Sequence, residues 1–237
     1  QHSFAEQAYL ESTAEYLDLY GKMYPRYQWF QEFLDCSYEK RPLFVCEYSH
    51  AMGNSCGDLK RYWDIFYSSD RFCGGCIWEW ADHAIRLRAK DGTVYDGYGG
   101  DFGEKAHQGN LCADGLTSPD RSPHSALLEA KQAYAPVNIE AAGKDGTIRL
   151  TNRCHADDLG NAALCWEICQ DGVVVQKGEL RNIRTPPGDT AEFPLPYRKE
   201  GLLGEVFLNI RVILAAETLW APASHVLYQW QQKLDVP

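Results

Sequence analysis

The sequence has no apolar run long enough to cross a membrane, because the stretch 206–208 is soon followed by Asn209 and Arg211. The N-terminus lacks the basic and then apolar pattern of a secretion signal. Positive charge is also scarce, with 23 Lys and Arg against 33 Asp and Glu and a formal net charge of -10. Because affinity for phosphates depends on Lys and Arg, we expect a soluble protein without membrane or nucleic-acid partners.

The sequence has nine cysteines, an odd number, so at least one thiol is left without a disulfide partner in the chain. Several of them lie in apolar runs, where free thiols commonly pack as small hydrophobic side chains: Cys36, Cys46, Cys165 and Cys169. A reduced, cytoplasmic setting fits this usage best. With 237 residues, 45% of them hydrophobic, the chain can form one large or two ordinary domains. It starts at Gln1 without an initiator Met, and we interpret it as part of a longer polypeptide.

The first half alternates between strand and helix patterns. The hydrophobic spacing predicts strands over 16–23, 43–46 and 74–80, and helices over 27–34 and 57–67. This βαβαβ order is the repeating unit of a parallel α/β barrel. Three strands cannot close a barrel of eight. A long loop over 91–114 and a helix over 125–134 are expected to follow.

The second half has short alternating runs that are separated by turn signals. Asp-Gly pairs at 145–146 and 171–172 predict tight hairpins, and 186–189 predicts a further turn. About seven such runs in roughly a hundred residues are typical of an immunoglobulin-like β-sandwich. The predicted fold class is therefore α/β plus all-β, with a partial barrel over residues 1–135 and a sandwich over 136–237.

Chemistry is indicated where the apolar run 43–46 turns polar at Glu47. An α/β barrel presents its catalytic groups at the carboxyl ends of its strands. On position alone, however, a helix-capping or ion-paired Glu47 is the better interpretation. The residues that follow Glu47 in the sequence reverse that preference.

Four strings in order carry a family resemblance: EYSHAMGNS at 47–55, GGDFG at 99–103, CADGL at 112–116 and DRSPH at 120–124. They closely resemble the β-galactosidases of glycoside hydrolase family 2. The resemblance spans roughly Met23 to the C-terminus and is strongest over 42–131. It implies that the three predicted strands are the sixth, seventh and eighth of a TIM barrel, with the first five upstream, and that a sandwich domain follows.

The resemblance also implies roles for individual residues. Glu47 matches the nucleophile, and Tyr24 matches a tyrosine that hydrogen-bonds it. His50 and Trp78 match residues that bind the sugar. The family's general acid belongs to an Asn-Glu motif that does not occur in this sequence, so we expect it upstream. Glu79 could replace it, but strand alternation points Glu79 away from Trp78, which favours a structural role.

Two metal ions are expected from the same resemblance. The Leu111 carbonyl and Asp114 match a sodium site that also touches the sugar, although many relatives have Phe and Asn at these two positions. The magnesium ligands, including the general acid, are expected upstream. We therefore expect Na⁺ and Mg²⁺ in the complete protein, without assigning either ion to this chain alone.

The predicted function is hydrolysis of terminal β-D-galactose from lactose-type β-galactosides, with retention, through a covalent galactosyl intermediate on Glu47. The isolated chain is expected to be inactive, and the complete enzyme to be a homo-oligomer. One alternative is a non-catalytic module that docks on a complementary chain. Another is a different family 2 specificity, such as β-glucuronidase, which the HAMGN string at 50–54 disfavours.

Overall fold

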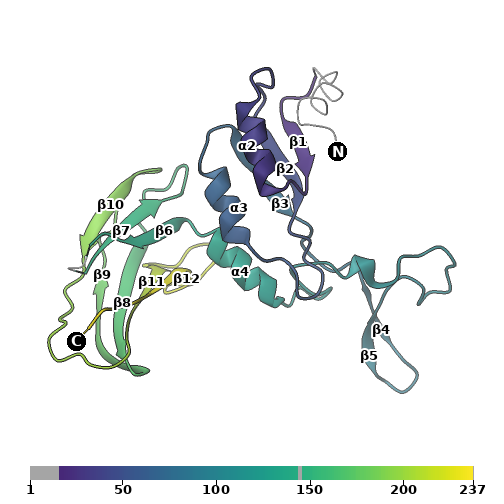
Figure 1. Ribbon diagram of the computed structural model, residues 1–237. Helices are drawn as coiled ribbons and strands as arrows, with labels where there is room; N and C mark the ends of the chain where they lie inside the picture. Colours follow the sequence, from purple (N-terminus) through teal and green to yellow (C-terminus); the bar gives the residue numbers. More distant parts are fainter. Residues whose placement is uncertain (1–15, 144–145, 237) are drawn as a thin grey trace. The chain divides into compact units, whose positions relative to one another are not determined.

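The computed structural model describes residues 16–143 and 146–236 (Figure 1). The chain divides between Ala133 and Tyr134 into two compact units. Among the described residues, no helix combines the length and the apolar character that a membrane-spanning helix needs.

The first unit is built on three parallel strands in the order β1-β2-β3. Two helices connect them, so the predicted order of strand, helix, strand, helix and strand is confirmed, and within the described residues the sheet is not closed. The elements are β1 (Tyr20–Met23), α2 (Tyr27–Asp35), β2 (Leu43–Tyr48), α3 (Leu59–Phe66) and β3 (Phe72–Ile77). Two predicted bounds are wrong, because the first strand begins only at Tyr20 and the third ends at Ile77 rather than at residue 80.

The core of this unit lies where α2 and α3 meet one face of the sheet. The apolar residues of both helices recur at helical spacing, so each helix presents one apolar side. Their rings and the strand side chains form one cluster that includes Phe30, Phe33, Leu43, Val45, Tyr48, Leu59, Phe66 and Phe72. Gly75 of β3 permits close pairing, since a Cβ there would lie 2.6 Å from the Val45 carbonyl oxygen.

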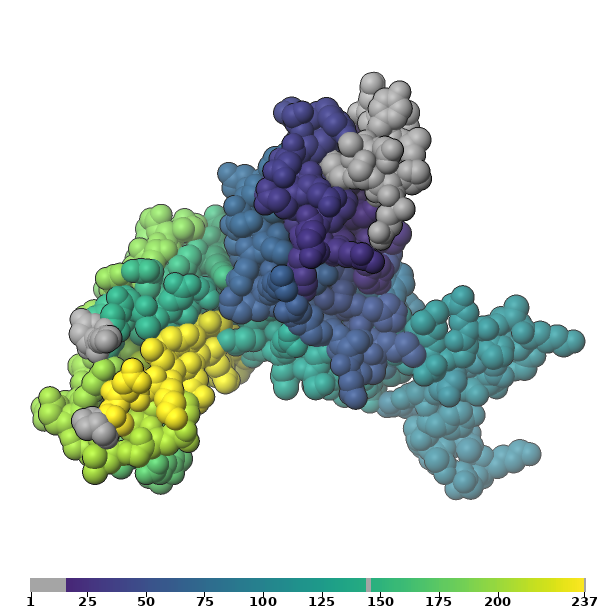
Figure 2. All heavy atoms as spheres, viewed as in Figure 1, coloured from purple at the N-terminus to yellow at the C-terminus, as the bar shows by residue number. Residues whose placement is uncertain are grey.

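The predicted loop over 91–114 is partly wrong. It contains the second strand of an antiparallel hairpin and a short 3-10 helix, and the hairpin stands clear of the sheet core in Figures 1 and 2. The Asp91-Gly92 pair that forms its turn is the same signal that predicted hairpins in the second half. These elements are β4 (Ile85–Arg88), β5 (Val94–Gly97) and η1 (Gly109–Cys112), and the unit ends with α4 (Ser125–Ala133).

The described part of the second unit has seven antiparallel strands in two sheets, ordered β10-β7-β6 and β12-β11-β8-β9. The strands are β6 (Val137–Ala141), β7 (Thr147–Asn152), β8 (Ala162–Gln170), β9 (Val173–Leu180), β10 (Thr190–Pro194), β11 (Val206–Leu214) and β12 (Val226–Lys233). The hairpin predicted at 171–172 is confirmed. It joins β8 to β9, and Asp171 and Gly172 both have positive φ, as a tight turn of this kind requires. The one predicted at 145–146 includes Asp145, which lies outside the described residues.

Both sheets contribute to one apolar core. β11 shows the cause, because Val206, Leu208, Ile210 and Val212 are buried in strict alternation along the strand. Residues of β8 lie beside them in the same sheet, and residues of β6 and β7 come from the other sheet. The alternating pattern that predicted strands in this half is thus also the pattern that builds its core.

Candidate functional site

Glu47 and Tyr24 lie at the ends of neighbouring strands. Met23 and Glu47 are paired in the β1–β2 register, and the Tyr24 amide donates to the Glu47 carbonyl at 2.8 Å. The Tyr24 hydroxyl lies near the Glu47 carboxyl group. Partial burial and the negative charge of Glu47 raise the pKa of Tyr24 to about 12. The phenol therefore keeps its proton at neutral pH and is available as a hydrogen-bond donor to the carboxylate.

Asp114 contacts two residues that follow strands of this sheet: His50 after β2 and Trp78 after β3. Its side chain is buried, with only 4% exposed, and its Oδ2 accepts a hydrogen bond from Trp78 Nε1 at 2.8 Å. His50 Nε2 lies 3.5 Å from the same oxygen. Backbone pairing fixes this arrangement, because the Trp78 amide donates to the Tyr48 carbonyl and the Ala51 amide to the Trp78 carbonyl.

The two groups form one site. The negative charge of Asp114 also contributes to the raised pKa of Tyr24, which places the carboxylate near the phenol. The structure therefore brings together residues that the sequence spreads over 91 positions: Tyr24, Glu47, His50, Trp78 and Asp114. Their individual roles stay predictions.

Glu79 does not lie where alternation predicted. The strand ends at Ile77, so the rule that successive side chains face opposite sides no longer applies at this position. The Glu79 carboxyl group lies near Asp114 and 3.3 Å from His83 Nε2. Burial and the neighbouring Asp114 carboxyl raise the pKa of Glu79. Strand patterning could not reveal this contact, because the segment after β3 pairs with residues 112–117 instead.

The proposed cation site is represented here by two residues. Asp114 Oδ1 is buried and has no hydrogen-bond partner among residues 16–143 and 146–236. A carboxylate oxygen of this kind is a suitable ligand for a hard cation. Leu111 lies in η1 with an exposed side chain. In these same ranges, no group of three or more His, Cys, Asp or Glu side chains is arranged to hold a metal ion. The sodium site at Asp114 and Leu111 and the upstream magnesium ligands stay predictions.

Comparison with known proteins identifies the family. Residues 4–139 match the model of the glycosyl hydrolases family 2 TIM barrel domain, and residues 148–235 match β-galactosidase domain 4. The chain belongs to glycosyl hydrolase family 2. The family 2 match covers all the site residues named above, and the β-galactosidase domain match lies in the second unit.

The curated relatives that the chain matches include several β-galactosidases. A β-galactosidase of Actinobacillus pleuropneumoniae is 40% identical over 88% of this chain, and one of Arthrobacter sp. (strain B7) is 37% identical over 82%. β-Galactosidase 2 of Enterobacter cloacae is 35% identical over 93% of the chain. These alignments cover 20%, 20% and 22% of the relatives, so the chain spans about a fifth of their length.

Proposed function

We propose that this chain supplies the nucleophile side of a retaining β-galactosidase that releases terminal β-D-galactose from lactose-type galactosides. The observation that supports it most strongly is the position of the protonated Tyr24 hydroxyl near the Glu47 carboxyl group, at the ends of adjacent strands. A nucleophile must be ionised, and a donor that keeps its proton stabilises the ionised form. Trp78, His50 and Asp114 supply an apolar ring and polar atoms beside this pair, as a sugar requires.

The proposed reaction has two displacements at the anomeric carbon. Glu47 forms a bond to that carbon while the bond to the glycosidic oxygen breaks, and a carboxylic acid gives its proton to the departing oxygen. Water then attacks the galactosyl ester, loses a proton to the same acid in its carboxylate form, and restores Glu47. We place that acid outside residues 1–237, in the Asn-Glu motif implied by the family resemblance. The chain alone is therefore expected to be inactive.

We further propose what the two units represent. The open sheet β1-β2-β3 is assigned to the last three strands of a family 2 barrel, and the two antiparallel sheets to an immunoglobulin-like domain. The family model for the TIM barrel domain supports the first assignment, and the seven strands around one core support the second.

A sodium ion would be held by Asp114 and the Leu111 carbonyl together with ligands from elsewhere. When bound, it would offset the negative charge of the Asp114 carboxylate and offer a coordination position to a sugar hydroxyl. Asp114 itself orients Trp78 and His50 through its Oδ2. The magnesium ligands are assigned outside this chain.

Paired substitutions in a complete enzyme that contains this chain test the proposal. Glu47→Gln keeps the shape but loses the nucleophile, so it should abolish turnover while galactose binding persists. Glu79→Gln is the matched control and should be far milder, although the raised pKa of Glu79 is a property that a general acid needs. If Glu79→Gln were the more damaging change, the assignment of roles would be wrong.

A further inference from the structure

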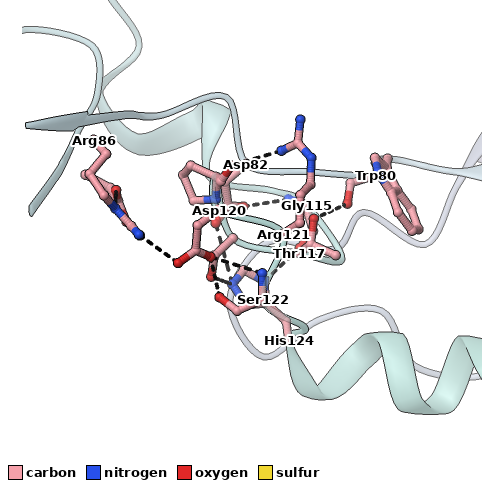
Figure 3. Close-up of polar contacts among 12 residues, drawn as sticks. Trp80, Asp82, Arg86, Gly115, Thr117, Asp120, Arg121, Ser122 and His124 are labelled. Carbon is pink, nitrogen blue, oxygen red and sulfur yellow. Dashed lines mark hydrogen bonds and ion pairs between the residues drawn. The ribbon is translucent and has the colours of Figure 1, made fainter.

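We propose that Asp82 and His124 are positioning residues that hold Asp114 against Trp78 and His50 by binding the Gly115 peptide groups. This inference rests on the proposed function, because it concerns the same sugar site. Neither side chain is expected to touch the substrate. Both act on the backbone that carries Asp114, and Figure 3 shows them on either side of Gly115.

The peptide between Asp114 and Gly115 is held at both of its polar ends. Its carbonyl oxygen accepts a hydrogen bond from the Glu79 amide at 2.9 Å. Its N–H, on Gly115, donates to Asp82 Oδ1 at 2.8 Å. A peptide group fixed at both ends cannot rotate, so the bond from the Asp114 backbone to its side chain has a fixed direction.

The next peptide is held in the same way. The Leu116 N–H donates to the Glu79 carbonyl at 2.9 Å, and the Gly115 carbonyl lies 2.9 Å from His124 Nδ1. A carbonyl oxygen can only accept, so Nδ1 must carry the proton in this contact. Two successive peptides are therefore anchored by the Glu79 backbone on one side and by the side chains of Asp82 and His124 on the other.

The close approach at Gly115 shows how tightly this segment is packed. A Cβ on Gly115 would lie 2.2 Å from the Asp82 nitrogen and 2.3 Å from the Ala81 carbonyl carbon. Real atoms do not approach so closely, so only glycine allows the backbone to reach the Asp82 carboxylate.

The other nitrogen of the His124 ring contacts the loop that follows Gly115. His124 Nε2 lies 2.9 Å from Ser118 Oγ and 3.6 Å from Asp82 Oδ2. The ring therefore spans from the Gly115 carbonyl to the Ser118 hydroxyl, while Asp82 flanks both the Gly115 amide and the ring. The side chains of Asp82 and His124 are 12% and 38% exposed, which suits a support beside a site rather than a solvent-facing pair.

The first test uses the chain itself and measures no activity. The Trp78 indole N–H donates to Asp114, so its NMR resonance, assigned with Trp78→Phe, reports the position of that carboxylate. We expect Asp82→Ala to shift this resonance and to speed exchange of the Gly115 amide by about 10-fold or more. Asp82→Asn, which keeps an accepting oxygen, should restore most of both signals.

Two histidine variants separate the contacts of the ring. His124→Asn places an amide N–H near the position of Nδ1 and should preserve the Trp78 resonance. His124→Gln places its amide near Nε2, loses the Gly115 contact and should shift that resonance. Asp96→Ala is the matched control, because Asp96 lies in β5 of the hairpin and binds Arg86 there. An unchanged Trp78 resonance in both Asp82→Ala and His124→Gln would overturn the proposal.

The second test measures kinetics in the complete enzyme. A misplaced Asp114 weakens sugar binding, so Asp82→Ala should lower kcat/KM by about 10-fold to 100-fold, mainly through a higher KM. Asp82→Asn should recover most of the loss, and Asp96→Ala should stay within about twofold of the parent. Equal falls in all three variants, or normal kinetics in Asp82→Ala, would overturn the positioning role. Failure of the proposed function is distinct, since the parent enzyme would then cleave no galactoside.

Discussion

The two units of this chain solve different problems with strands. In the second unit, each sheet is antiparallel and buries one face in a common core, and none of the predicted site residues lies there. In the first unit, the strands are parallel, and residues that follow two of them, His50 and Trp78, contact Asp114, while the sheet stays open within the described residues. The second unit is thus built to bury apolar faces, whereas the parallel strands of the first unit end at one common edge.

This difference shows how a parallel sheet concentrates chemistry. Because all three strands run the same way, the residues that follow them emerge at one edge. Tyr24 follows β1, Glu47 lies near the end of β2, and Trp78 follows β3. An antiparallel sheet sends successive strand ends to opposite edges, and its hairpins close with turn residues such as Asp171 and Gly172. The parallel arrangement places functional side chains close together, whereas the antiparallel sheets mainly form a stable apolar core.

The largest effect that would sharpen this comparison comes from separating the units. We expect residues 137–237 to fold alone, because their two sheets bury each other's apolar faces. We expect residues 1–135 not to fold alone, since an open parallel sheet leaves unpaired backbone groups at its edges. Circular dichroism and cooperative unfolding of each piece provide the measurement. A cooperative, monomeric 1–135 piece would break the comparison.

A smaller effect, on the free energy of unfolding, is expected from a substitution that creates a cavity in the core of the second unit. Leu164 of β8 is fully buried, so Leu164→Ala should lower the free energy of unfolding of this unit by about 2–5 kcal/mol. Val174→Ala, on the exposed strand β9, is the control and should change it by less than about 0.5 kcal/mol. Urea unfolding followed by hydrogen exchange locates the change. Equal loss of protection in both units would show that they do not unfold separately.

The smallest effect concerns a thiol in the first unit. Burial raises the pKa of Cys56 to about 11, and the residue is only 4% exposed. The folded state favours the neutral thiol, so this contribution to stability is complete below about pH 9 and is lost as the pH rises through about 11. At pH 8, iodoacetamide should modify Cys56 at least about 10-fold more slowly than the exposed Cys73. Equal rates by mass spectrometry would show that the core around Cys56 opens readily.

Local patterns were sufficient for some elements and not for others. The helix α2 and the turn at Asp171 depend on residues close in sequence, and both were predicted. The hairpin β4–β5 was missed because its strands are short and largely exposed, so they show no clear alternation. Its Asp91-Gly92 turn was nevertheless visible in the sequence.

The site divides in the same way. Glu47 could be singled out because a strand pattern ends beside it, and the family resemblance supplied its neighbours. The contact between Glu79 and Asp114 could not be predicted, because it depends on pairing between residues 79–83 and 112–117. Asp82 and His124 were missed for the same reason, since each acts on Gly115 through a contact that sequence spacing does not encode.

The identity of the nucleophile is the central claim, and covalent labelling tests it most directly. A 2-deoxy-2-fluoro-galactosyl fluoride slows hydrolysis of a galactosyl ester, because fluorine destabilises the positive charge that develops on the sugar in the transition state. The complete enzyme would be inactivated with this reagent, digested and mapped by mass spectrometry. The account predicts that the fluorosugar is attached to Glu47. A label on Glu79 or on any other carboxylate would contradict it.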